Sequence, residues 1–271
     1  FQRSVSSMGY YGGLRLLKAT LLVFINHCEE NNVPLHNRGF RLTYSTDIPV
    51  LLGLSGSSAI ISACLRALGT WYGVKMEPWR MANLAWQVET EQLHIPAGLQ
   101  DRVAQAYNHP VFMDFDQSYF NSNPHGRYEK LNRPLKNIYI AYSDTLAEGT
   151  EKTHGNLQER FNNGDTKMLE AVENWKSLTV SFRDALEAGD VNSMNDCIDA
   201  NFDIRNELVT LDPKQVELVM LARKSGASAK FCGSGGAIVG MYKDQATLDR
   251  LKEDLSSAGV NILLPNIVYT S

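Results

Sequence analysis

The sequence lacks several features that would place it in a particular structural class. It has only four cysteines in 271 residues, and no two of them form a Cys-x-x-Cys pair. This spacing excludes a zinc ribbon and a disulfide framework, so we expect a reducing, cytoplasmic setting. The longest apolar stretch, residues 48–54, contains Pro49 and Gly53. It is far shorter than the roughly 20 residues of a transmembrane helix, so no membrane partner is expected.

The sequence also lacks an excess of basic residues. Its 26 Lys and Arg against 30 Asp and Glu give a formal net charge of −4, so no global positive field would attract nucleic acid. The hydrophobic share of 44% and the charged share of 21% are typical of a soluble globular protein. The first residues contain no initiator Met, signal-peptide core or transit-peptide pattern, and we therefore expect an incomplete N-terminus.

Hydrophobic periodicity predicts the elements of the first half of the chain. We expect a strand over 39–46, in which Phe40, Leu42 and Tyr44 alternate with polar residues. A second strand is expected over 111–115. Apolar residues at helical spacing predict four helices, and the second of these should be the central buried one. The predicted helices cover residues 14–27, 58–72, 78–93 and 99–107.

Residues 116–133 are rich in Asn, Ser, Pro, Gly and charge, which favours a domain boundary. We predict one domain over 1–125 and a second over 126–271. The second should contain a strand at 137–142 and a long helical tract over 156–224. A strand, a helix and a closing strand are then expected at 237–242, 245–258 and 261–268.

A Gly- and Ser-rich segment follows the apolar stretch and leads into the central helix. Small residues let the backbone curl so that several N–H groups point outward at a helix N-terminus, a geometry that binds phosphate. The alternative is an ordinary capped helix after a flexible loop. No Lys follows the last Gly, so this is not a Walker A loop. The segment comprises Gly53, Leu54, Ser55, Gly56, Ser57 and Ser58.

A second Gly-rich loop lies near the C-terminus and precedes an apolar strand. Lys230 stands at its start and could direct its charge toward a phosphate or an acid. A β-bulge or a hairpin turn is an equally good explanation of such a cluster. The loop comprises Gly233, Ser234, Gly235 and Gly236.

Acidic residues lie between the two Gly-rich loops. Glu89 and Glu91 each fit a plausible stripe of the helix expected there, so periodicity leaves open which of them faces inward. Asp101 follows a Pro-Ala-Gly turn at the start of the next helix. It is either a catalytic acid–base group or an ordinary helix cap.

Together, three strings resemble a known signature. PVLLGLSGSSA (49–59), GLQD (98–101) and KFCGSGGA (230–237) are similar to the second motif, the catalytic-aspartate segment and the third motif of the GHMP kinases. Longer strings such as AGLQDRVAQAY and NFDIR most resemble the branch that phosphorylates glucuronic acid at its anomeric hydroxyl. The resemblance implies an α+β fold with a ribosomal S5 domain 2-like N-terminal domain and a ferredoxin-like C-terminal domain. The family's Pro/Asn-Gly-rich first motif is missing, so we expect the N-terminal domain to be partial.

The resemblance also implies cofactors and residue roles. ATP and Mg²⁺ would be the cofactors, and residues 53–58 would hold the nucleotide phosphates. Ser57, rather than Ser58, would bind Mg²⁺ together with Glu89, which lies seven residues before Pro96 as the family pattern requires. Asp101 would accept the proton of the sugar hydroxyl. The loop over 233–236 would close on the site and fix phosphate and substrate.

The acceptor would be a small-molecule sugar or sugar acid. A sugar acid needs a cation for its carboxylate, and Arg205 and Arg102 are the candidates, although either could equally be structural. Other acceptors stay open: heptose phosphate, arabinose, galactose or mevalonate. A catalytically silent relative that senses nucleotide or sugar is a further alternative, against which the presence of Asp101 argues. The oligomeric state is left open.

Overall fold

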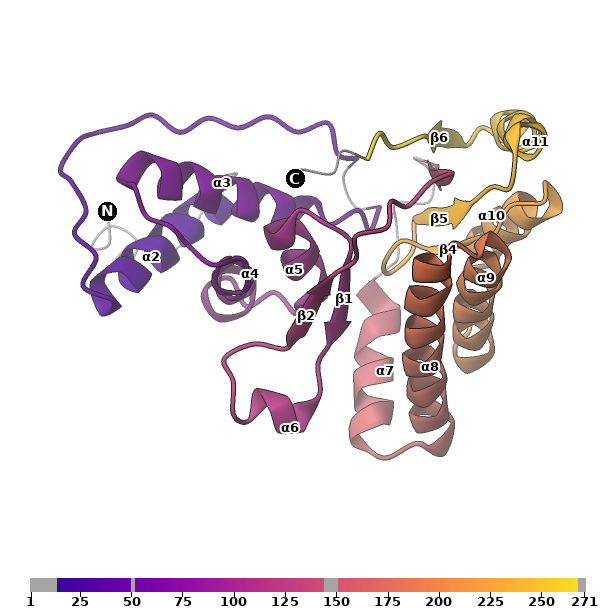
Figure 1. Cartoon of the computed structure of the whole chain (residues 1–271), viewed down its shortest axis with the longest axis horizontal. Coiled ribbons are helices and arrows are strands. Elements are labelled where there is room, and N and C mark those ends of the chain that lie inside the picture. The colour runs from indigo at the N-terminus through magenta and orange to yellow at the C-terminus, as the bar shows by residue number, and fades with distance from the viewer. Residues whose placement is uncertain (1–13, 50–51, 144–150, 268–271) are drawn as a thin grey trace. The chain divides into compact units, whose positions relative to one another are not determined.

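The computed structural model describes residues 14–49, 52–143 and 151–267, and for 151–156 it describes the backbone alone. The chain divides into two compact units (Figure 1). The first contains the residues up to Ile48 together with Ser55–Lys130, and the second contains Pro49–Leu54 together with the residues from Leu131 onward. Residues 52–54 therefore group with the second unit, although the rest of that unit begins at Leu131.

The described part of the first unit is mainly helical, as the apolar periodicity predicts. Its core is built from the inner faces of these helices, with Phe24, Ile61 and Leu65 fully buried. Gly73, at φ 70°, ends the central helix in the left-handed conformation that suits glycine. The elements are α2 (Arg15–Glu30), α3 (Gly56–Tyr72), α4 (Pro78–Gln87), the π-helical turn η1 (Val88–Gln92) and α5 (Gln100–Tyr107).

A two-stranded hairpin completes the first unit. β1 (Val111–Asp114) pairs antiparallel with β2 (Arg127–Lys130), and the short helix α6 (Gln117–Phe120) lies between them. The stretch over 116–133 is therefore more structured than its polar composition indicates. Because the backbone of β2 pairs with β1, residues 127–130 stay with the first unit, and the division falls after Lys130 rather than after residue 125.

The strand predicted over 39–46 is wrong. In the described part of the chain, no other segment forms backbone hydrogen bonds with these residues, which have no regular secondary structure. The ring of Phe40 instead lies 6.0 Å from that of Trp71 and 6.3 Å from that of Tyr72, at the end of α3. Of the three apolar residues, only Leu42 packs against the core, and Phe40 and Tyr44 are exposed. The alternation does not produce a strand here because it does not specify a strand partner.

The second unit is an α+β layer structure around a four-stranded antiparallel sheet. The strand order is β4-β5-β3-β6. Along the chain, β3 is followed by helices, then by β4 and β5, then by a helix and β6, which is the β-α-β-β-α-β arrangement of ferredoxin-like folds. This confirms the predicted C-terminal topology. The strands are β3 (Ile138–Tyr142), β4 (Lys230–Phe231), β5 (Ala237–Met241) and β6 (Asn261–Leu263).

The predicted helical tract is divided into separate helices, and an aspartate caps the N-terminus of three of them. β6 ends at Leu263, earlier than predicted, and residue 268 lies outside the described residues. Tyr139 and Phe202 are the largest side chains of the core, and the Tyr139 hydroxyl donates to Ser228 O at 2.7 Å. Among the described residues, no helix combines the length and apolarity needed to cross a membrane. The helices are α7 (Glu151–Asn162), α8 (Thr166–Ala188), α9 (Val191–Leu208), α10 (Pro213–Lys224) and α11 (Gln245–Ser257).

Candidate active site

The central helix α3 begins within the predicted phosphate loop. Ser55 is its N-cap residue and has a left-handed backbone at φ 57°, and its side chain forms no capping hydrogen bond. The Ser58 hydroxyl donates back to Ser55 O at 3.0 Å, which tightens the first turn. A 17-residue helix whose first-turn amides have no side-chain cap presents N–H groups and a positive dipole end to an anion.

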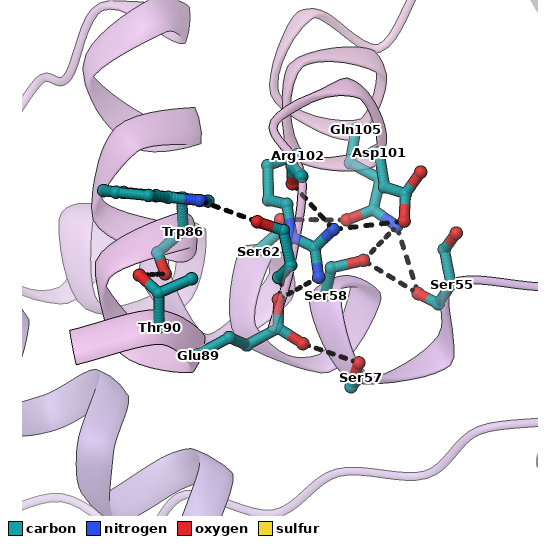
Figure 2. Close-up of polar contacts among 12 residues, drawn as sticks. Ser55, Ser57, Ser58, Ser62, Trp86, Glu89, Thr90, Asp101, Arg102 and Gln105 are labelled. Atoms are coloured by element: carbon teal, nitrogen blue, oxygen red, sulfur yellow. Dashed lines mark hydrogen bonds and ion pairs between the residues drawn. The ribbon is translucent and has the colours of Figure 1, made fainter. Parts of the chain in front are cut away.

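Glu89 lies against this helix start. The Ser57 hydroxyl donates to Glu89 Oε1 at 2.7 Å (Figure 2). The Glu89 side chain is buried, with an exposed fraction of 1%, whereas Glu91 is exposed. Of the two acids that periodicity left open, the structure therefore brings Glu89 to Ser57.

A π-helical turn orients Glu89. The sequence predicts one helix over 78–93, but α4 ends at Gln87 and the next five residues form η1. Leu93 N donates to Val88 O at 3.2 Å, five residues back, and Ile95 N donates to Glu89 O at 2.7 Å. Such single wide turns occur often at functional sites. An extra residue in the turn changes which side chains face inward, and so the simple helical stripes could not decide between the two acids.

Arg102 connects the two predicted acidic residues. Its Nε donates to Glu89 Oε2 at 2.7 Å, and its Nη2 contacts the same oxygen. Its Nη1 donates to Asp101 Oδ2 at 3.1 Å and to Gly98 O at 2.9 Å. Arg102 is buried, with 6% exposed. Because every guanidinium nitrogen has an acceptor inside the protein, this geometry does not support the prediction that Arg102 binds the substrate carboxylate.

Asp101 lies in the first turn of α5. The N-cap residue of this helix is Leu99, so the alternative of Asp101 as a helix cap does not hold. One turn further, Gln105 Nε2 donates to Ser55 O at 3.2 Å and to Ser58 Oγ at 3.1 Å. Figure 2 shows Asp101 and Gln105 on the face of α5 that is turned toward these serines. The sequence analysis missed Gln105, although its spacing of four residues from Asp101 could have indicated a shared helix face.

In the second unit, the two predicted Gly-rich loops meet. A Cβ atom on Gly53 would lie 2.8 Å from Gly235 O, and one on Gly233 would lie 3.0 Å from Gly53 O. Only glycine permits this close backbone approach. Gly236 N donates to Gln215 Oε1 at 3.3 Å, a contact that the sequence did not indicate. Within the predicted phosphate loop, Gly53 and Leu54 belong to the second unit and Ser55–Ser58 to the first.

Arg205 and Lys230 flank the loop over 233–236. Arg205 donates to Gly233 O at 2.8 Å and to Ser234 O at 3.1 Å, and its guanidinium lies 5.3 Å from the centre of the Phe231 ring. Lys230 Nζ donates to Phe231 O at 3.2 Å. Burial lowers the pKa of both side chains. Neither cation forms an ion pair with Asp or Glu in the described ranges.

Ser57 and Glu89 supply oxygen atoms, the kind of ligand that Mg²⁺ prefers. The described side chains contain no group of three or more His, Cys, Asp and Glu that could hold a metal ion by itself. Mg²⁺ in nucleotide sites is usually bound by one or two protein groups together with substrate phosphates and water. A hydroxyl and a carboxylate in mutual contact, beside a helix N-terminus, fit this kind of site.

Comparison with known proteins finds relatives that match most of the chain. Residues 15–109 match the GHMP kinases N terminal domain, and residues 182–261 match the GHMP kinases C terminal domain. Glucuronokinase 1 of Arabidopsis thaliana is 37% identical over 94% of this chain and 72% of its own length. Probable glucuronokinase 2 of the same plant is 39% identical over 85% of this chain and 64% of its own length.

A solved structure supports the fold independently. The phosphomevalonate kinase of Streptococcus pneumoniae superposes with a TM-score of 0.73 at 15% identity and covers 92% of this chain and 81% of its own. At that identity the likeness concerns the fold alone. With both family domains present and a relative of 37% identity over most of both chains, the chain belongs to the GHMP kinase family.

Proposed function

We propose that this chain transfers the γ-phosphoryl group of ATP to the anomeric hydroxyl of D-glucuronate, giving glucuronate 1-phosphate and ADP. The observation that carries the proposal is the cluster of Ser57, Glu89, Arg102 and Asp101 at the N-terminus of α3. The acceptor follows from the similarity to two glucuronokinases. Phosphoryl transfer depends mainly on positioning and charge neutralisation, and such a cluster supplies both.

Each residue has a role in this proposal. The uncapped first-turn amides of α3 bind the nucleotide phosphates. Gly53, Gly233 and Gly235 let the two Gly-rich loops approach each other closely. Ser57 and Glu89 would hold Mg²⁺, which neutralises charge on the phosphate oxygens when bound. Asp101 accepts the proton of the anomeric hydroxyl. That oxygen forms a bond to the γ-phosphorus while the bond to the ADP oxygen breaks.

The preference for an acid requires a cation. Arg102 is already engaged by two carboxylates, so we assign the glucuronate carboxylate to Arg205, with Lys230 as its neighbour. Both are half-buried cations without an acidic partner in the described part of the chain. Pairing with an incoming anion stabilises a half-buried cation that has no acidic partner. We also propose a cytoplasmic setting for the protein, because no two of its cysteines form a Cys-x-x-Cys pair.

The test is ADP release with a panel of acceptors: glucuronate, glucose, galactose, arabinose, a heptose phosphate and mevalonate. We expect kcat/KM for glucuronate to exceed that for glucose at least tenfold, because a cation left without its partner costs about 1–3 kcal/mol. Arg205→Gln should reduce this ratio, and Arg183→Gln, at a half-buried arginine of α8 that pairs with Asp184, is the matched control. Equal kcat/KM on glucose and glucuronate would remove the sugar-acid claim. ATP binding without turnover on any acceptor would favour the silent relative.

A further inference from the structure

We infer that Arg102 is a positioning residue that aligns the metal-binding carboxylate and the proton-accepting carboxylate of this site. The inference rests on the proposed function, which makes Glu89 the metal ligand and Asp101 the base. It goes beyond that function by assigning a role to the one buried cation that touches both acids.

The contacts select one oxygen of Glu89. Two guanidinium nitrogens, Nε and Nη2, both contact Oε2, and the Ser57 hydroxyl contacts Oε1 (Figure 2). Because the guanidinium N–H groups hold Oε2 while the Ser57 hydroxyl holds Oε1, both oxygens are engaged and the rotation of the carboxyl group is restricted. Oε1 is thereby kept in contact with the Ser57 hydroxyl. These two oxygens are the ones that would hold Mg²⁺.

The same guanidinium holds Asp101 by one oxygen. Nη1 donates to Oδ2 and also to Gly98 O, the carbonyl at the turn that precedes α5. This second contact anchors the guanidinium to the backbone. The Asp101 side chain remains 31% exposed, and the oxygen that Arg102 does not engage is the one we assign to the sugar hydroxyl. Arg102 itself is 6% exposed and does not touch substrate, so it acts through the two acids.

Charge supports the same role. Glu89 and Asp101 are like charges linked through a single cation, and burying a carboxylate such as Glu89 costs free energy unless a cation pairs with it. A lysine at this position would supply a charge but could not place three N–H groups on two carboxylates and a carbonyl in one fixed plane. Arg102→Lys would therefore keep the positive charge and lose the fixed geometry of the guanidinium. Loss of an outer partner of a metal ligand typically lowers metal affinity or activity by about 10- to 100-fold.

The experiment compares Arg102→Lys with the wild type and with Arg127→Lys, a change at an exposed Arg–Asp pair of the same unit. Mn²⁺ binding in the presence of ADP is measured by EPR, alongside kcat, the KM for ATP and the thermal unfolding temperature. For Arg102→Lys we expect Mn²⁺ affinity and kcat to fall by about tenfold or more, with a folded protein. Arg127→Lys should match the wild type. In Arg102→Ala, added methylguanidine should restore part of kcat.

The outcomes separate this inference from the proposed function. Mn²⁺ affinity and kcat of Arg102→Lys within twofold of the wild type would overturn the positioning role. A fall in unfolding temperature with Mn²⁺ affinity unchanged would also overturn it, because Arg102 would then be only structural. Should the wild type turn over none of the acceptors, the proposed function fails, and the EPR measurement still decides whether Arg102 orients Glu89.

Discussion

The helix N-termini of the two units are built differently. In the second unit, four helices begin with an aspartate whose carboxylate accepts a hydrogen bond from a first-turn backbone N–H. In the described part of the first unit, the four longer helices have no side-chain cap. The capping residues of the second unit are Asp165, Asp190, Asp212 and Asp244, and the uncapped positions of the first are Leu14, Ser55, Glu77 and Leu99.

This difference distinguishes helix starts that are stabilised by their own side chains from helix starts that leave their backbone N–H groups for a ligand. An aspartate cap satisfies backbone donors within the protein and stabilises the helix. An uncapped start leaves those donors for a ligand, and two such starts in the first unit, those of α3 and α5, carry Ser57 and Asp101. Asp116, which caps the four-residue α6, is the exception within the first unit, and it lies outside the cluster around Glu89. Under the proposed function, acidic residues at helix starts therefore have different roles in the two units.

The strongest test of this comparison replaces one aspartate of each kind with asparagine. Asp101→Asn removes the proton acceptor from the uncapped start of α5, and general-base loss lowers kcat by about 10²- to 10⁴-fold. Nucleotide binding and the unfolding temperature should change little, because Asp101 satisfies no first-turn amide. Asp190→Asn is the matched control and should keep kcat. Wild-type turnover in purified Asp101→Asn would contradict the role of base.

A second test compares two acids two residues apart. Glu89→Gln should raise the Mg²⁺ concentration needed for half-maximal activity by about 10- to 100-fold, because it removes the anionic ligand beside Ser57. It should also lower the unfolding temperature, since Arg102 loses its buried partner. Glu91→Gln changes an exposed side chain and should do neither. The opposite result would move the metal site to Glu91.

Both tests use residues that the sequence identifies only in part. Motif order and spacing predicted Asp101, Ser57 and the Gly-rich loops, because tight backbone geometry requires glycine at fixed positions. Which of Glu89 and Glu91 faces Ser57 depends on the π-helical turn η1. Such a turn is set by packing and by contacts with the residues that follow it, such as the hydrogen bond from Ile95 N to Glu89 O. Local periodicity does not contain that information.

Long-range contacts account for the other differences. Arg102 was predicted as a substrate cation, since a sequence cannot show that two acids and a carbonyl already surround its guanidinium. Similarly, Phe40 was placed in a strand, although its ring packs on Trp71. The grouping of 49–54 with the second unit follows from contacts between Gly53 and the loop over 233–236, which no local pattern indicates.

A smaller effect is expected at the capped helices. Asp190→Ala leaves the first-turn amides of Asn192 and Ser193 without their acceptor, and the loss of an N-cap lowers the unfolding temperature by a few degrees. The kcat should be unchanged, which is the inverse of Asp101→Asn. Asp184→Ala, at an exposed position near the end of α8, is the control for charge alone. A loss of kcat in Asp190→Ala at full stability would contradict the separation of roles.

The smallest effect is a dependence of stability on pH that belongs to the caps. Hydrogen bonds from Ser193 lower the pKa of Asp190, and those from Thr247 lower the pKa of Asp244. Because the folded pKa lies below the unfolded value of about 3.9, the stabilisation is fully present above that value and is lost as the pH falls through the folded pKa. Asn caps a helix about as well as Asp but does not titrate. Urea unfolding of Asp190→Asn should therefore match the wild type near neutral pH and fall less steeply below about pH 4. Parallel curves for the two proteins would show that the Asp190 cap makes no ionic contribution.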